Sequence, residues 1–234
     1  TERAVMACLI NASDSPVSIR ATSTALKYNA RTIRPLIPRD MWEELNALDL
    51  FLQQHCSTAV SRQQRYQLMA EVSRRCQMVV GVLDGTMLRG DAFDLFNIGR
   101  HLERADMTTR IMDVMVLQQL QPTQIKRPKF RWTSILNALG GIESYHYYLA
   151  QQSGDVDAID YLLAFADFPR SIAYCLNRVA ASAKGLPHSI SILQQVHQLQ
   201  ALLKAEPLTE LPHSVVVEGA ARQRGVQKGV DRPG

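Results

Sequence analysis

Apolar side chains recur at every third or fourth position through most of this chain, and this period limits the fold more than any other feature. The segment from Arg39 to Cys56 is typical, because its apolar residues fall on one side of a helix with 3.6 residues per turn. These residues are Met41, Leu45, Leu48 and Leu52. No segment shows the alternation of apolar and polar residues that marks a half-buried strand. The sequence therefore predicts an all-α protein.

Helical segments follow one another and are separated by Pro, Gly and polar residues. The predicted helices span residues 17–34, 39–56, 62–85, 91–119, 133–151, 157–166, 169–183 and 189–205. In the first of them the predicted buried stripe is Ile19, Thr22, Leu26, Ala30 and Ile33. Long helices joined by short turns favour an elongated antiparallel bundle. Gly and Pro then recur without a helical period, so we expect one helical domain over residues 1–206 and a disordered tail over residues 207–234.

The composition narrows the class of protein. A net charge of +4, with basic residues spread along the chain, argues against a nucleic-acid partner. No apolar run has the length of a membrane span, so we expect no membrane association. The four cysteines lack Cys-x-x-Cys spacing and lie in helical segments. This pattern favours free thiols in a reducing compartment over disulfides or a zinc site, and it predicts a cytoplasmic protein.

Two segments that lie 153 residues apart resemble each other. CLINASDSPVSI, residues 8–19, aligns with YLLAFADFPRSI, residues 161–172. In both, an apolar helix ends, an Asp and a Pro follow, and a new helix begins; Asp at such a place is expected to cap the helix N-terminus. The similarity of the two segments can be explained by two unrelated helix starts or by an internal duplication. The identical pairs are Leu9 and Leu162, Asp14 and Asp167, Pro16 and Pro169, Ser18 and Ser171, and Ile19 and Ile172.

The predicted helix over residues 91–119 carries a polar stretch in its middle. Arg100 and Glu103 are three residues apart, so their side chains can meet, and Asp106 and Arg110 are four apart. Gly99 lies one turn before Glu103; because glycine in a helix costs about 1 kcal/mol relative to alanine, we expect another helix or a ligand to approach closely there. The spacing fits ordinary ion pairs as well as a functional pocket. The adjacent residues predicted to be buried are Leu95, Leu102, Ala105 and Met112.

A duplication would give this polar stretch an upstream counterpart. Glu103 precedes Pro169 by 66 residues, and the same step back from Pro16 falls before residue 1. The chain also begins without Met. We therefore expect an incomplete first repeat followed by all of a second one.

The segment GRHLERAD, residues 99–106, resembles the signature of the bacterial alpha-E domain family, a duplicated all-helical family with a G-R-Y-L-E-R-A motif in each half. MWEELN (residues 41–46), TMLR (residues 86–89) and FPRSIAYCL (residues 168–176) match in the family's order, so the resemblance covers most of residues 1–203. His101 stands where the family usually has Tyr. Ala12 and Phe165 stand where an acidic residue is expected.

The resemblance implies which proteins this chain acts with, but it does not imply a particular reaction. Alpha-E proteins are encoded beside, or fused to, circularly permuted ATP-grasp ligases, often with transglutaminase-like proteins and a proteasome-like peptidase. The implied function is that of a helical component in ATP-grasp-dependent synthesis or modification of a peptide or amide bond, with the ligase and the transglutaminase-like protein as partners. A non-catalytic scaffold that docks the ligase and an acyl- or aminoacyl-transferase-like enzyme stay open as alternatives. The resemblance names no cofactor.

Arginines dominate the predicted site, because a guanidinium presents a planar fork of donors to a carboxylate or phosphate. Glu103 is the predicted catalytic residue, which would orient an arginine or accept a proton from an amine nucleophile. Helix capping is the alternative role for the segment around Asp167 and Arg170. The predicted anion-binding residues are Arg89, Arg100, Arg104 and Arg170, with Asp84 beside Arg89.

A metal site is not predicted. Glu143 and His146 form one Glu-x-x-His pair of the kind that binds iron in helical bundles. Such a site needs two of these pairs and two further glutamates, and the sequence offers one pair.

Overall fold

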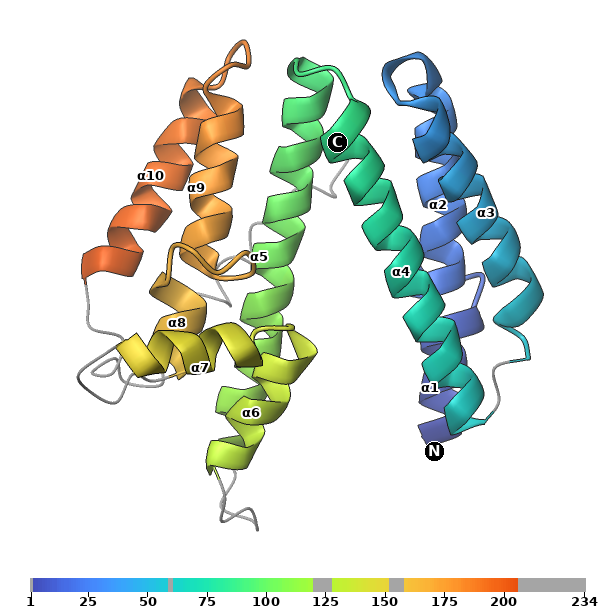
Figure 1. The fold of residues 1–234 in the computed structure, drawn as a ribbon, viewed down its shortest axis with the longest axis horizontal. Coiled ribbons are helices and arrows are strands. Elements are labelled where there is room, and N and C mark those ends of the chain that lie inside the picture. The colour runs from blue at the N-terminus through green and yellow to red at the C-terminus, as the bar shows by residue number, and fades with distance from the viewer. Residues whose placement is uncertain (1, 59–60, 120–127, 152–157, 206–234) are drawn as a thin grey trace, which may run out of the picture. The chain divides into compact units, whose positions relative to one another are not determined.

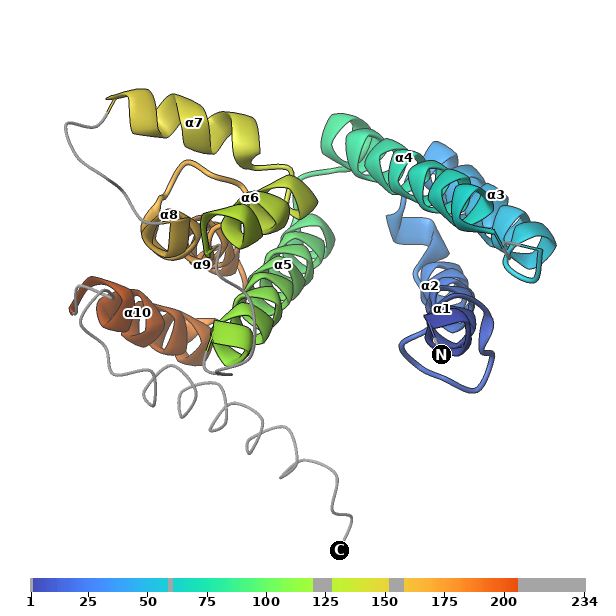
Figure 2. The ribbon, with the colours of Figure 1, turned by 90° about the horizontal axis from the view of Figure 1, so that it is seen from below.

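The computed structural model describes residues 2–58, 61–119, 128–151 and 158–205, and within these ranges the chain forms helices and no strand (Figures 1 and 2). The prediction of an all-α protein is confirmed. The predicted disordered tail, residues 207–234, lies outside the described residues. The helices are α1 (Glu2–Asn11), α2 (Ile19–Thr32), η1, a 3-10 helix (Arg34–Leu36), α3 (Arg39–His55), α4 (Arg62–Thr86), α5 (Asp91–Gln119), α6 (Pro128–Ala138), α7 (Ile142–Gln151), α8 (Ala158–Ala164), α9 (Ile172–Ala183) and α10 (Ile190–Ala205).

The chain divides into two compact units, residues 1–89 (unit 1) and residues 90–234 (unit 2). Unit 1 contains α1 to α4. In it, α2 packs against α1 and α3, and α3 packs against α4. The four residues predicted to point inward from α3, from Met41 to Leu52, are buried, which confirms that face. The core of unit 1 includes Ile10, Leu48, Leu52, Cys56 and Leu68.

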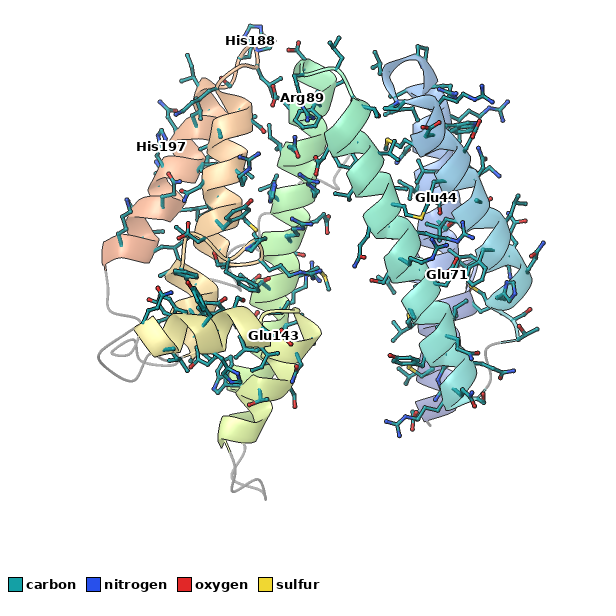
Figure 3. All side chains as sticks on the ribbon, viewed as in Figure 1. Glu44, Glu71, Arg89, Glu143, His188 and His197 are labelled. Carbon is teal, nitrogen blue, oxygen red and sulfur yellow. The ribbon has the colours of Figure 1, made fainter. Side chains whose placement is uncertain are left out.

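Polar contacts join the helices of unit 1 as well. The Lys27 ammonium on α2 donates to the buried Asp49 carboxylate on α3 at 2.8 Å. Arg75 on α4 bridges Glu44 on α3, at 2.9 Å, and Glu71 on its own helix, at 2.8 Å. Figure 3 labels the two glutamates. Charged side chains therefore fix the alignment of α3 with both of its neighbours.

The stripe predicted to be buried on α2 is only partly so. Ala30 is buried, but Leu26 is 39% exposed and Ile33 is 44% exposed, and Thr22 is exposed too. The prediction is wrong for these three, because α2 meets α3 through the neighbouring side of the helix. Ser23 and Lys27 lie on that side and bind Asp49.

In unit 2, α9 packs against α5, α8 and α10 (Figure 1). One core cluster surrounds α9 and consists of Ile98, Ile172, Leu176, Val179, Ala180, Ala183 and Val196. A second cluster joins α5, α6 and α8 and consists of Met112, Ile135, Leu136, Leu139, Ala158, Tyr161, Leu162 and Phe168. The position of α5 in the sequence was predicted correctly, from Asp91 to Gln119.

The single helix predicted over residues 133–151 is in fact two helices, α6 and α7. Gly140, between them, has a φ of +63°, in the left-handed region that side chains other than glycine disfavour. Gly141 lies against the Phe168 ring, where an added Cβ would come within 2.6 Å of a ring carbon. The pair of glycines ends α6 and lets α7 start in a new direction.

The two similar segments share their hydrogen bonds as well as their sequence. Ser18 caps α2 and Ser171 caps α9, each accepting a hydrogen bond of 3.0 Å from the backbone N–H three residues later. Each hydroxyl also donates back across its loop, from Ser18 to the carbonyl oxygen of Ala12 and from Ser171 to that of Phe165. The serine N–H groups donate three residues back, at 3.0 and 2.9 Å. The predicted caps, Asp14 and Asp167, are both exposed, and that prediction is wrong because the chain turns once more before each helix begins.

Candidate functional site

The inward face of α5 is largely polar. Asn97, His101 and Thr108 are each 1% exposed, whereas Leu95 and Leu102 are 58% and 47% exposed. The prediction that the two leucines are buried is therefore wrong, although Met112 is buried as predicted. One polar group of this face has its partner on the loop before α9, because the Thr108 hydroxyl donates to the Arg170 carbonyl oxygen at 2.9 Å. The Asn97 side-chain oxygen accepts from Arg100 of α5 itself.

Arg104 lies beside this face, half-buried between α5 and the start of α9. Burial lowers the pKa of the Arg104 guanidinium, and the positive charges of Arg100 and Arg170 lower it further. Within the described residues no carboxylate forms an ion pair with Arg104 or Arg170. The structure thus brings together three of the predicted anion-binding residues, and two of them lack an acidic partner in the part of the chain it describes.

Arg100 is held along its own helix. Its Nη2 donates to the Asn97 side-chain oxygen at 2.6 Å, and its guanidinium lies 5.9 Å from the centre of the Phe96 ring. Glu103 is exposed and makes no hydrogen bond or ion pair with any described residue, so the expected contact between Arg100 and Glu103 is absent. The reason is that Asn97 draws the guanidinium one turn back along α5, away from Glu103.

The outer side of α5 carries the remaining polar residues of the motif stretch. Arg110 and Asp106 form the predicted ion pair, at 2.6 Å, with both side chains well exposed. Gly99 is exposed, and a Cβ added there would meet no atom within 4 Å. No described residue therefore makes the close approach that was predicted at Gly99.

The other two predicted site residues belong to unit 1. The Arg89 guanidinium, in the turn that follows α4, donates to the backbone carbonyl oxygen of Asp84. Figure 3 labels Arg89. The structure therefore brings Asp84 and Arg89 together, through the backbone of Asp84.

Two further side chains of the arginine region, Tyr174 and Cys175, were not predicted from the sequence, and His101, noted there only as a departure from Tyr, lies beside them. The His101 and Tyr174 rings lie 5.8 Å apart, and Cys175 is fully buried next to Tyr174. Burial raises the pKa of the Cys175 thiol, while Arg104 and Arg170 act in the opposite direction. The signal in the sequence that could have found these side chains was His101, a titratable residue that stands where the family motif usually has Tyr.

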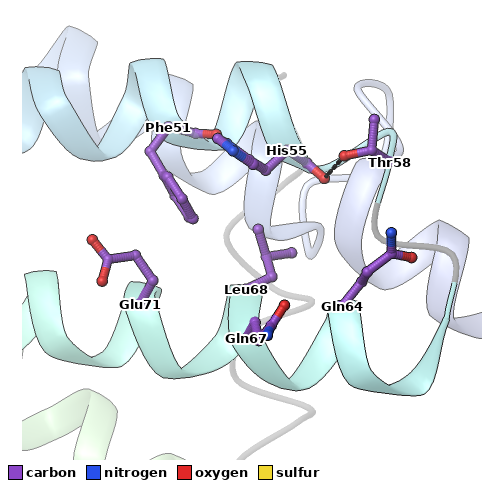
Figure 4. Close-up of a pocket in the computed structure, with 7 residues that line it drawn as sticks. All are labelled: Phe51, His55, Thr58, Gln64, Gln67, Leu68 and Glu71. Carbon is purple, nitrogen blue, oxygen red and sulfur yellow. Dashed lines mark hydrogen bonds between the residues drawn. The ribbon is translucent and has the colours of Figure 1, made fainter.

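A pocket of about 490 Å³ lies in unit 1, between the end of α3 and the start of α4 (Figure 4). The hydrogen bond from Arg74 holds the pKa of Glu71, at one end of the pocket, at about 2. Because Arg74 and Arg75 already balance that charge, the carboxylate creates no need for a cationic ligand. None of the predicted site residues lines the pocket; the lining residues are Phe51, His55, Thr58, Gln64, Gln67, Leu68 and Glu71.

The Glu-x-x-His pair gains no further ligand. Glu143 lies on α7, and both it and His146 are exposed (Figure 3). Within the described ranges no three His, Cys, Asp or Glu side chains are grouped so that they could hold a metal ion. No helix in the same ranges has both the length and the apolar character needed to cross a membrane.

Comparison with known proteins gives one match. The Alpha-E family model, described as a predicted alpha-helical domain with a conserved ER motif, matches residues 1–229. Glu103 and Arg104 form the Glu-Arg pair of the GRHLERAD segment in α5, and their side chains differ in setting, one exposed and one half-buried. No curated protein and no solved structure matches the chain.

Proposed function

This chain belongs to the Alpha-E family, and we propose that it is the helical component of an ATP-grasp-dependent system that makes or modifies a peptide or amide bond. Its own task in that system is to bind a carboxylate or phosphate group. The partners are an ATP-grasp ligase and a transglutaminase-like protein, as the family resemblance implies.

The arginine region of unit 2 carries this proposal. The positive charges of Arg100 and Arg170 both act on Arg104, and Arg104 is half-buried. Three like charges at short range are unfavourable, and partial burial strengthens their repulsion. A bound anion would remove that repulsion and accept paired hydrogen bonds from a guanidinium.

The surrounding structure supports a site that is formed before the ligand arrives. The hydrogen bond from Thr108 holds the backbone of Arg170 against α5, and Asn97 holds the Arg100 guanidinium. The Arg100 side chain, fixed by Asn97, loses less conformational entropy when it binds a ligand. Glu103 stands one residue before Arg104 with its carboxylate exposed, so it is available to orient a substrate amine or accept a proton from it.

Titration calorimetry of the whole chain with inorganic pyrophosphate, and separately with a short peptide that ends in a carboxylate, tests the anion site. We expect Arg104→Gln to weaken binding at least tenfold, which corresponds to about 1.4 kcal/mol. Arg110→Gln is the matched control, because Arg110 lies on the exposed side of the same helix and pairs with Asp106. Equal affinity in the two variants, or no binding of either probe to the unaltered chain, would contradict the proposal.

A scaffold that docks the ligase is the second candidate, and a specific observation favours it. The exposed side of α5 presents Leu95 and Leu102 on either side of Gly99, an apolar surface on which another protein can pack. Glu103→Gln distinguishes the two functions in the reconstituted ligase system. If the variant binds the ligase but stops product formation, the site is chemical; if product formation is unchanged, the chain is a scaffold.

An acyl- or aminoacyl-transferase function has the least support. The thiol nearest the arginines, Cys175, is fully buried, and burial raises its pKa. Both effects disfavour the thiolate that a covalent mechanism would need.

We also propose the internal duplication. The repeated serine caps support it, and so does a second matched pair of contacts. The Thr22 hydroxyl donates to the Pro16 carbonyl oxygen at 3.4 Å, and the Cys175 thiol lies 3.8 Å from that of Pro169. Each donor follows its proline by six residues, so side chains of different chemistry make the same local contact.

A further inference from the structure

The pocket in unit 1 is the strongest feature that the proposed function does not use. Its volume of about 490 Å³ lies within the usual range of small-molecule sites. Phe51 and His55 line the pocket from α3 (Figure 4). Gln64, Gln67 and Leu68 line it from α4. Aromatic rings on one side and amides on the other suit a flat ligand whose edge forms hydrogen bonds.

The side formed by α3 is a stack of flat groups. The Phe51 and His55 rings have centres 4.4 Å apart and planes at 23°, and the Arg75 guanidinium lies over the Phe51 ring, 5.5 Å from its centre. The His55 Nδ1 lies 2.8 Å from the Phe51 carbonyl oxygen; because a carbonyl can only accept, Nδ1 donates, and this bond holds the ring. His55 is exposed and contacts no further ring among the described residues, so a flat ligand can extend the stack.

The side formed by α4 offers amides. No residue in the described ranges binds the Gln67 side chain, so its amide has a donor and an acceptor side by side. The Gln64 Oε1 accepts from the backbone N–H that precedes α4, at 2.9 Å, which leaves its NH2 group as a donor. The Glu71 carboxylate is bound by two arginines of its own helix. The polar groups that α4 offers to a ligand are therefore uncharged.

We propose that this pocket binds the adenine base of a nucleoside or nucleotide. A heterocycle stacks on an aromatic side chain through its face, which is the role of His55. An amide pairs with adenine through two hydrogen bonds, because the adenine amino group donates and the neighbouring ring nitrogen accepts, which is the role of Gln67. This inference rests on neither the anion site nor the ligase.

The same reasoning disfavours guanine. Guanine presents two acceptors at the corresponding edge, which suit an arginine or a lysine. The arginines beside the pocket, Arg74 and Arg75, are already bound to glutamates. An amide with one donor therefore selects the base with one donor.

NMR titration of the whole chain with adenosine tests the stack. A base that stacks on His55 shields the Cε1–H of that ring, so its signal moves upfield; His55→Gln identifies the signal by its loss. We expect a saturable upfield shift of the His55 signal and none of the signal of His188, which lies in unit 2 between α9 and α10. An unmoved His55 signal overturns the proposal.

Two matched variants test the choice of base. Gln67→Met keeps the length of the side chain and removes its amide, so we expect adenosine to bind at least tenfold more weakly. Gln63→Met is the control, because Gln63 is also exposed on α4 but does not line the pocket, and its affinity should be unchanged. Circular dichroism establishes that both variants keep their helices. Equal affinities of the two variants overturn the proposal.

Two further ligands complete the test on the unaltered chain. Inosine carries an acceptor oxygen in place of the amino group of adenine, so we expect it to bind at least tenfold more weakly than adenosine; equal affinity overturns the proposal. Adenosine monophosphate distinguishes the two sources of the base. An affinity equal to that of adenosine supports a pocket for the nucleoside alone, and a higher affinity supports a pocket that holds the phosphate too. Because the readout is the His55 signal, phosphate bound at the arginine region of unit 2 does not register.

Discussion

At the scale of single residues, Asp49 is a buried polar side chain of unit 1 whose loss should lower stability. It is 3% exposed and accepts hydrogen bonds from Lys27, Ser23 and Gln53. Asp49→Ala removes a buried carboxylate and the three hydrogen bonds that it accepts, so we expect the free energy of unfolding in urea to fall by about 2 kcal/mol. Asp106→Ala breaks an exposed pair and should change it by less than about 1 kcal/mol. Equal effects would show that burial of Asp49 adds nothing.

Glu71 should make stability depend on acid pH. Its pKa is lowered from 4.5 to about 2, chiefly by the hydrogen bond from Arg74, so the folded state holds the charged form more strongly than the unfolded chain. The contribution is therefore complete above pH 4.5 and disappears as the pH falls toward 2. Urea unfolding of Glu71→Gln should differ from that of the unaltered chain at pH 6 and match it near pH 2. A constant difference across that range would contradict the assignment.

The four thiols should react in an order set by burial. Cys8 is exposed, while Cys56 and Cys175 are buried and burial raises their pKa. Alkylation at pH 8, followed by mass spectrometry, should modify Cys8 first and leave Cys56 and Cys175 intact until urea is added. Early modification of Cys175 would show that its surroundings open readily.

At the scale of helices, two glycine substitutions should act in opposite directions. Gly140→Ala forces alanine into a φ of +63° and should lower stability by about 1 kcal/mol. Gly99→Ala places a methyl group in open space on an exposed helix and should raise stability by up to about 1 kcal/mol. Thermal unfolding followed by circular dichroism measures both. A loss of stability on Gly99→Ala would reveal a neighbour that packs on that side of α5.

The order and approximate limits of most helices follow from the sequence, but their inward faces do not. Periodicity located α5 well, yet it assigned Leu95 and Leu102 to the interior, where Asn97, His101 and Thr108 lie. Hydrophobicity alone cannot reveal that a facing loop offers a carbonyl oxygen to Thr108. The break at Gly140 was also missed. The sequence shows that a residue is glycine but does not show whether its φ is positive or helical.

The composition of the arginine region could be predicted from the sequence only in part; its role as a site stays a prediction. The motif stretch identified Arg100 and Arg104, and the repeated loop identified Arg170, which the structure brings together. Contact between Arg100 and Glu103 was expected from spacing, but spacing cannot show that Asn97 competes for the guanidinium. Tyr174 and Cys175 were not predicted because nothing in their own segment is unusual for a buried helix.

At the scale of the whole molecule, the two compact units predict separate responses to local damage. Asp49→Ala weakens the contact between α2 and α3, both in unit 1. Hydrogen exchange followed by mass spectrometry should therefore show faster exchange across residues 2–89 and little change across residues 90–205. Faster exchange in both units would mean that they unfold together.

The hydroxyl of Thr108 has a consequence for how the arginine region could change over evolution. Apolar contacts already align α5 with α9, and the directional bond from Thr108 to the Arg170 carbonyl oxygen adds a preference for one alignment. Replacing Thr108 by valine, which has a similar shape, would keep the side-chain volume but remove the hydrogen bond that favours one alignment of α5 with the loop before α9. The distance between Arg104 and Arg170 would then be held less closely, so selection for a ligand of a different size could act first on this uncharged position.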